Sequence, residues 1–342
     1  MLLRPFLNDA TSCSSYVFGC GTHAKLAVVD PHVDLVDDYL ATAAALGAPI
    51  VAVFETHVQA DHVSGLPELV ARSGATVYLP TGAGVEFEHV ALADGDVIEL
   101  GNTLVTAIAT PGHAPAHHAY TVADRRRGTE EPWLVFSGDS LLIGDVGRPD
   151  LHVAGDARGQ ALLLHTSVKR LLELPDHVVL YPSHYAGSVC GRGLSGNPVS
   201  SIGFERAHNS LLAIADADIF ADALLAEMPP PPEEQKRIVA ANRAGFGGRG
   251  RVTGPVELGL RAFSGNYRLG PAPCGDFRPI LARDLRGMQK KPAVDMSKTY
   301  TICRTFTGAT GLEPATSGVT GRRSNQLNYA PRANRSLARR CP

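Results

Sequence analysis

The chain has 342 residues, of which 44% are hydrophobic and 19% charged, and its formal net charge is −2. This composition predicts a globular protein with a hydrophobic core, and the small net charge indicates neither a nucleic acid nor a membrane as a partner. The sequence shows no secretory signal, no long apolar run and no CxxC pair, so we expect a cytoplasmic protein whose six cysteines are reduced.

Short strand patterns fill the first half of the chain, and helical patterns separate some of them. The predicted strands are Ser15–Phe18, Lys25–Val29, Ile50–Phe54, Thr76–Leu79, Val97–Leu100, Leu104–Ala109, Ala119–Val122, Trp133–Ser137 and Val178–Tyr181. The predicted helices are Pro31–Leu46 and Leu66–Arg72, which end at Gly47 and Gly74, then Gly155–Leu174, and finally Asp216–Gly248, which a proline run interrupts. This order favours an α/β fold in which two packed sheets carry helices outside, a four-layer αββα sandwich, although periodicity alone leaves a doubly wound sheet open.

The last quarter of the chain differs in character. After about residue 248, Gly, Arg, Ser and Pro dominate, apolar periodicity fades and basic residues accumulate. We therefore predict one domain over residues 1–248 and a basic Gly/Ser/Arg-rich tail over residues 249–342, disordered or non-native, without a recognisable rhodanese domain.

Candidate metal ligands follow four of the predicted strands. His57, Asp61 and His62 lie on a loop between a strand and a helix, where imidazole and carboxylate groups can converge on a metal. His113, Asp139 and His184 each stand just past another strand. Any one of these could be a half-buried structural side chain or a helix cap, but their conjunction favours a metal site.

The remaining histidines receive weaker interpretations. His117 and His118 lie close enough to His113 in sequence to support a ligand. Five isolated histidines are expected to be surface or core residues rather than ligands, namely His89, His152, His165, His177 and His208.

The order of HxxxDH, PGH, GD and PSH over residues 1–245 resembles the metallo-β-lactamase superfamily. The resemblance implies the superfamily's four-layer sandwich and two adjoining metal sites. It assigns the ligands as follows: His57 and His113 to the first site, Asp61, His62 and His184 to the second, and Asp139 to both.

Gln59 departs from the family pattern, which has a second histidine at that position. A neutral amide is a poor zinc ligand, so a fully occupied two-zinc site is not expected. Two histidines and one carboxylate remain, His57, His113 and Asp139, and this is the composition of a facial triad for ferrous iron. The triad and the later GDSLLIGDVGRPD segment resemble the persulfide dioxygenase branch of the superfamily.

The resemblance also suggests how a substrate is held. Arg148 would bind the carboxylate of glutathione or a related thiol carrier, and Tyr185 would offer its hydroxyl. A structural role for either side chain stays open. Cys190 is interpreted as a pocket-wall thiol or as a redox-active one.

The leading hypothesis is an oxidoreductase with one Fe(II) per chain, which oxidises a glutathione-type persulfide with dioxygen to sulfite and thiol. Asp61 and His62 would then orient ligands or carry protons as catalytic groups. The alternative is a glyoxalase II-like hydrolase of thioesters or lactones that uses one or two Zn(II) ions. A metal-binding or sulfide-sensing module without activity is a third reading, and a homodimer is left open.

Overall fold

The computed structural model describes residues 1–185, 196–226, 228, 231 and 233–245. All of these residues belong to one compact unit. The predictions for residues 249–342 and for Cys190 lie outside the described residues.

The first of two mixed sheets uses the N-terminal part of the chain. Its strand order is β1-β2-β3-β4-β5-β6, antiparallel from β1 to β3 and parallel from β3 to β6. The bounds are Leu2–Asn8, Cys13–Cys20, Lys25–Val29, Ile50–Phe54, Thr76–Pro80 and Val90–Leu92.

The second sheet has the order β12-β11-β10-β9-β8-β7, in which only β10 and β11 are parallel. From β7 to β12 the bounds are Val97–Leu100, Thr103–Ala109, His118–Asp124, Leu134–Gly138, Val179–Pro182 and Ser200–Ser201. All nine predicted strands are therefore confirmed, and β1, β6 and β12 were not predicted.

Five of the six α-helices correspond to predicted helices, whereas the helix over Ile202–His208 was not predicted. Gly47 and Gly74 end the first two α-helices in the left-handed conformation, with φ of 60° and 70°, as the sequence predicts. The α-helices are α1 Val36–Leu46, α2 Leu66–Ser73, α3 Ala157–Leu171, α4 Ile202–His208, α5 Ala217–Leu225 and α6 Gln235–Ala244, and short 3₁₀ turns span Val33–Leu35 and Arg125–Arg127. Among these described helices, none is both long and apolar enough to cross a membrane.

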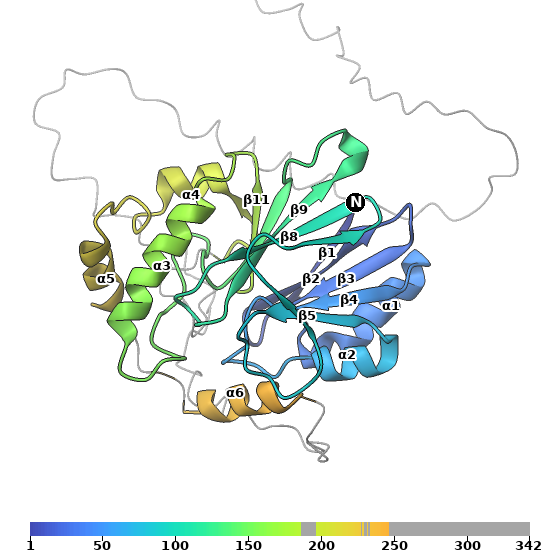
Figure 1. Cartoon of the computed structure of the whole chain (residues 1–342), viewed down its shortest axis with the longest axis horizontal. Helices are drawn as coiled ribbons and strands as arrows, with labels where there is room; N and C mark the ends of the chain where they lie inside the picture. The colour runs from blue at the N-terminus through green and yellow to red at the C-terminus, as the bar shows by residue number, and fades with distance from the viewer. Residues whose placement is uncertain (186–195, 227, 229–230, 232, 246–342) are drawn as a thin grey trace, which may run out of the picture. The chain divides into compact units, whose positions relative to one another are not determined.

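Three hydrophobic clusters define the layers. An aromatic-rich cluster that includes Phe18, Phe54 and Phe136 lies between the two sheets. A second cluster joins α1 and α2 to the first sheet, and a third joins α3, α4 and α5 to the second sheet. Figure 1 shows these helices on the outer faces of the two sheets. The predicted four-layer αββα sandwich is therefore confirmed.

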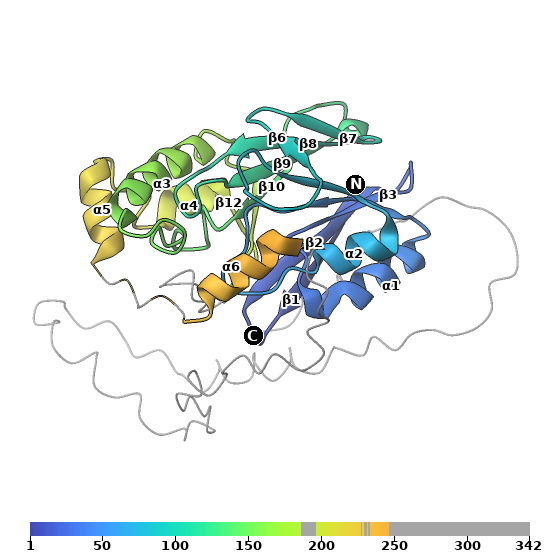
Figure 2. The ribbon, with the colours of Figure 1, turned by 60° about the horizontal axis from the view of Figure 1, so that its bottom comes forward.

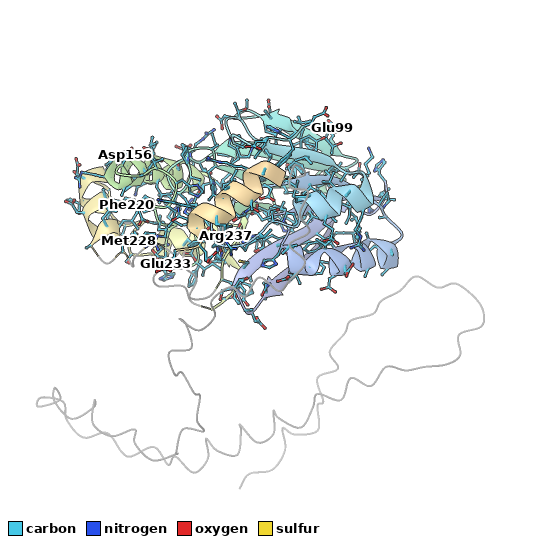
Figure 3. All side chains as sticks on the ribbon, turned by 90° about the horizontal axis from the view of Figure 1, so that it is seen from below. Glu99, Asp156, Phe220, Met228, Glu233 and Arg237 are labelled. Atoms are coloured by element: carbon cyan, nitrogen blue, oxygen red, sulfur yellow. The ribbon has the colours of Figure 1, made fainter. Side chains whose placement is uncertain are left out.

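Helix α6 lies apart from these outer layers, at one end of the sandwich and close to α2 (Figure 2). Figure 3 views the molecule from this end, with α6 in front of the sheets and Arg237 labelled on the helix. Asn242 of α6 hydrogen-bonds to the loop that follows β4. The C-terminal described helix thus reaches the loop that carries the first predicted metal ligands.

Candidate metal centre

The predicted ligands converge where β4, β8, β10 and β11 end. All of them except the partly buried Asp61 are buried, and most belong to one of two groups, within each of which the candidate ligand atoms lie within 4.8 Å of one another. We call His57, His113 and His152 the histidine cluster, and Cys13, Asp61, His62 and His184 the thiol cluster. Asp139 lies between them.

His57 lies three residues after the end of β4, and buried hydrogen bonds through Thr56 to Asp30 hold its ring. Its Nδ1 lies 2.9 Å from Thr56 Oγ1, which in turn lies 2.9 Å from Asp30 Oδ2. Because the Asp30 carboxylate can only accept, the Thr56 hydroxyl donates to it and is left to accept from His57 Nδ1. This tautomer leaves His57 Nε2 with a lone pair for a metal. Burial holds the pKa of His57 well below its usual value, so the imidazole is neutral.

His113 follows β8 through a turn that only glycine fits. Gly112 has φ of +131°, and a Cβ at this position would lie 2.3 Å from the backbone nitrogen of Leu164 in α3. His113 Nδ1 donates to the carbonyl of Arg148 at 2.9 Å, which directs Nε2 toward Asp139.

Two buried polar atoms at this point lack a partner. His113 Nε2 lies 3.5 Å from Asp139 Oδ2, and neither atom has a hydrogen-bond partner among the described residues. Buried polar atoms are seldom left unsatisfied. A metal ion bound by both atoms would satisfy them, so the donor set fits a resident metal.

Asp139 follows β10 and links the two clusters. Its backbone N–H donates to His117 Nε2 at 3.1 Å, and its Oδ1 lies 2.8 Å from His184 Nδ1. Although burial favours the neutral carboxyl, His184 and His113 hold the pKa of Asp139 below its usual value. Asp139 is therefore an anion at neutral pH, as a ligand must be.

The two neighbours of His113 in sequence behave differently. His117 accepts the Asp139 N–H through Nε2, so its Nδ1 carries a proton and faces the hydroxyls of Thr110 and Ser140. It thus supports Asp139, in line with the prediction. His118 belongs to neither cluster, and its charged neighbours are Asp94, Asp96 and Arg170.

The thiol cluster contains a residue that sequence reasoning missed. Cys13 Sγ lies 3.4 Å from His184 Nε2, 3.5 Å from His62 Nδ1 and 3.6 Å from Asp61 Oδ2. Asp61 Oδ2 is itself 2.6 Å from His184 Nε2, and Asp61 Oδ1 is 3.2 Å from His62 Nδ1. Asp61, His62 and His184 are thus brought together as the family pattern implies, with a thiol added.

His152 is the second residue near the site that sequence reasoning did not single out, since it was expected to be a surface or core residue rather than a ligand. Its ring centroid is 5.6 Å from that of His113 and 6.1 Å from that of His57. Burial lowers the pKa of His152 to about 3, which leaves a neutral imidazole. Its position four residues after Arg148, in the segment that packs on His113, was the available signal. The other four isolated histidines lie outside both clusters.

The predicted substrate-binding residues are both engaged within the protein. Arg148 is 2% exposed, and its guanidinium donates to both carboxylate oxygens of Asp150, at 2.7 and 2.8 Å. The hydroxyl of Tyr185 donates to Asp9. Contact of either side chain with a substrate stays a prediction.

Gln59 occupies the position where the family pattern has a histidine, and it is completely buried. It lies close to Glu55, a carboxyl whose pKa burial raises to about 8. An amide at this position cannot supply the imidazole that would complete the first zinc site.

Comparison with known proteins assigns the chain to a family. The sequence model of the family described as "Metallo-beta-lactamase superfamily" matches residues 8–184, just over half of the chain. The crystal structure of ETHE1 from Myxococcus xanthus is similar, with a TM-score of 0.62 and 30% identity, over 72% of this chain and 100% of that one.

Curated relatives divide between two activities. Hydroxyacylglutathione hydrolase of Polaromonas is 33% identical over 53% of this chain, which spans 65% of that protein. The mitochondrial persulfide dioxygenase ETHE1 of Bos taurus is 26% identical over 63% of this chain and 77% of its own length. The two relatives differ in the reaction that their names give. The chain belongs to the metallo-beta-lactamase superfamily, and it is a metalloenzyme of that fold.

Proposed function

We propose that the protein is an iron-dependent persulfide dioxygenase. The observation that carries the proposal is the facing pair of unsatisfied atoms, His113 Nε2 and Asp139 Oδ2, in a chain that has a buried glutamine at the sequence position where a binuclear site needs a histidine. His57, His113 and Asp139 would hold the metal as two neutral imidazoles and one carboxylate. This is a typical ferrous set that leaves coordination positions open.

The reaction takes a thiol persulfide, dioxygen and water to the free thiol, sulfite and two protons. Bound ferrous iron would supply coordination for the persulfide sulfur and for dioxygen. The chain holds the ligand tautomers through the hydrogen bonds of Thr56 and through the Arg148 carbonyl. It also excludes water, since His57, His113 and Asp139 are each at most 1% exposed. His152, beside two of these ligands, is placed to contact whatever occupies the open side.

A zinc hydrolase of thioesters is the second candidate. Asp61, His62 and His184 converge in the thiol cluster, and Asp139 Oδ1 reaches His184. Zinc at these residues would lower the pKa of a bound water to roughly 7. The identity to hydroxyacylglutathione hydrolase supports this alternative.

The two candidates separate in one experiment. The protein is purified without oxygen, its iron and zinc are measured, and oxygen uptake with glutathione persulfide is compared with hydrolysis of a glutathione thioester. We expect about one iron per chain and persulfide-dependent oxygen uptake, both lost in His113→Ala. His165→Ala, a similarly buried histidine outside both clusters, is the matched control and should keep them. Thioester turnover with zinc and without oxygen uptake would overturn the proposal.

A further inference from the structure

Cys13 is the one member of the thiol cluster to which the family pattern assigns no role. We propose that Cys13 binds metal as a thiolate, so that Cys13, Asp61, His62 and His184 form a closed, four-ligand site for zinc. This site is distinct from the triad His57, His113 and Asp139.

The number of polar neighbours around Cys13 supports the proposal. A thiol carries one proton and can donate to one acceptor, yet Sγ lies within 3.6 Å of three groups, a carboxylate and two imidazoles. The sulfur can also accept from the two imidazoles, but the four candidate ligand atoms lie within 4.8 Å of one another, close enough to surround a single ion. A cation bound by all four side chains satisfies each of them, and the thiol proton is released on binding.

The His184 ring is oriented for this site. Its Nδ1 lies 2.8 Å from Asp139 Oδ1, which leaves Nε2 facing Cys13 and Asp61. A carboxylate that fixes the far nitrogen of a histidine is the usual support for a zinc ligand. The His62 ring is held by stacking on His32, with centroids 4.8 Å apart and planes 12° apart.

The backbone brings Cys13 to the late histidine. Cys13 and His184 form an isolated antiparallel β-bridge, and the N–H of Ser14 donates to the carbonyl of Ser183 at 2.7 Å. The N–H of Tyr185 donates to the carbonyl of Ser12. These contacts attach the start of β2 to the loop after β11, so the thiol is placed by the fold and is 4% exposed.

The ligand chemistry selects the metal and its role. A set of one thiolate, two imidazoles and one carboxylate favours zinc over ferrous iron. Four protein ligands complete a tetrahedron and leave no position for water, as in structural zinc sites. The thiol cluster would then stabilise the loops while the open triad carries the chemistry, and this argues against hydrolysis by zinc at the thiol cluster.

X-ray absorption at the zinc edge tests the proposal on the full-length protein loaded with zinc. The wild type should show a sulfur scatterer at about 2.3 Å beside nitrogen or oxygen at about 2.0–2.2 Å. Cys13→Ser should lose the sulfur scatterer and bind zinc at least about tenfold more weakly, which competition with a chromophoric chelator measures. Cys20→Ser, the other buried cysteine among the described residues, should match the wild type.

If Cys13→Ser does not fold, the source of the sulfur scatterer can still be identified by removing the other cysteines. A variant with serine at Cys190, Cys274, Cys303 and Cys341 serves this purpose. It leaves the thiol cluster intact and should keep the sulfur scatterer. A wild-type spectrum with nitrogen and oxygen alone would overturn the proposal, as would loss of sulfur in this fourfold variant or in Cys20→Ser. Because the spectrum reports ligands and not turnover, its outcome is separate from that of the oxygen-uptake assay.

Discussion

The side chain of Asn242 in α6 hydrogen-bonds to the loop that carries His57, Asp61 and His62. Substitution of Asn242 should make this loop more mobile. Its Nδ2 donates to the carbonyls of Gln59 and His62 at 3.0 and 2.9 Å, and its Oδ1 accepts from the N–H of Ser64 at 3.0 Å. Asn242→Ala removes all three hydrogen bonds at once. The loop itself keeps its sequence and its ligands.

The size of the effect follows from these contacts. A hydrogen bond of this kind contributes about 1 kcal/mol net, so three bonds contribute about 3 kcal/mol. Asn242 is half-buried, so water can form some of the hydrogen bonds that Asn242→Ala removes. We therefore expect a loss of about 2 kcal/mol in the free energy of unfolding. Zinc should bind on the order of tenfold more weakly, because Asp61 and His62 lose a fixed backbone.

Urea unfolding of the metal-free protein measures the first effect, and chelator competition measures the second. Arg243→Ala changes the exposed neighbour on the same helix and should stay within about 0.5 kcal/mol of the wild type. An Asn242→Ala protein with wild-type stability and zinc affinity would refute the idea that α6 holds the ligand loop.

Three further outcomes are expected from the ligand loop. Thr56→Val removes the acceptor of His57 Nδ1 and should weaken iron binding by about 10- to 100-fold, as metal titration would show. Gln59→His adds the imidazole that the family pattern places in the first site and should raise the affinity for zinc there, which chelator competition measures; an unchanged affinity would show that Gln59 does not limit that site. Burial raises the pKa of Glu55 from 4.5 to about 8, so the native carboxyl keeps a proton that the unfolded chain releases. Stability of the metal-free protein should therefore fall as pH rises between these values. The fall should be smaller in Glu55→Gln, where Asp30, whose pKa burial raises to about 6, still contributes, and urea unfolding would measure the difference.

The strands that the sequence predicts share one property, a short run of mostly apolar or β-branched residues. Strand β1 was missed because Pro5 interrupts its pattern, and proline cannot donate within a sheet. The structure accommodates Pro5 because β1 is an edge strand, paired only with β2. Strands β6 and β12 have three and two residues, too few for any alternation to show.

The site divides in a similar way. His57, His113, Asp139 and His184 are predictable because each stands where a strand pattern stops, and strand ends meet at one edge of the sandwich. Cys13 stands at the beginning of a strand, and its relation to His184 spans 171 positions. No local pattern encodes that contact, because it depends on how one sheet lies on the other.

The histidine cluster and the thiol cluster therefore depend on the interface between the two sheets. The loop after β4 of the first sheet supplies His57, Asp61 and His62, whereas loops of the second sheet supply His113, Asp139 and His184. Asp30 links the two sides of this interface, because its carboxylate accepts a hydrogen bond from the Thr56 N–H and another from the Ser183 hydroxyl. A metal held from both sides binds only when the sheets are packed, so its binding free energy adds to the stability of the sandwich. Loss of metal should thus loosen the contact between the sheets before it disrupts either sheet.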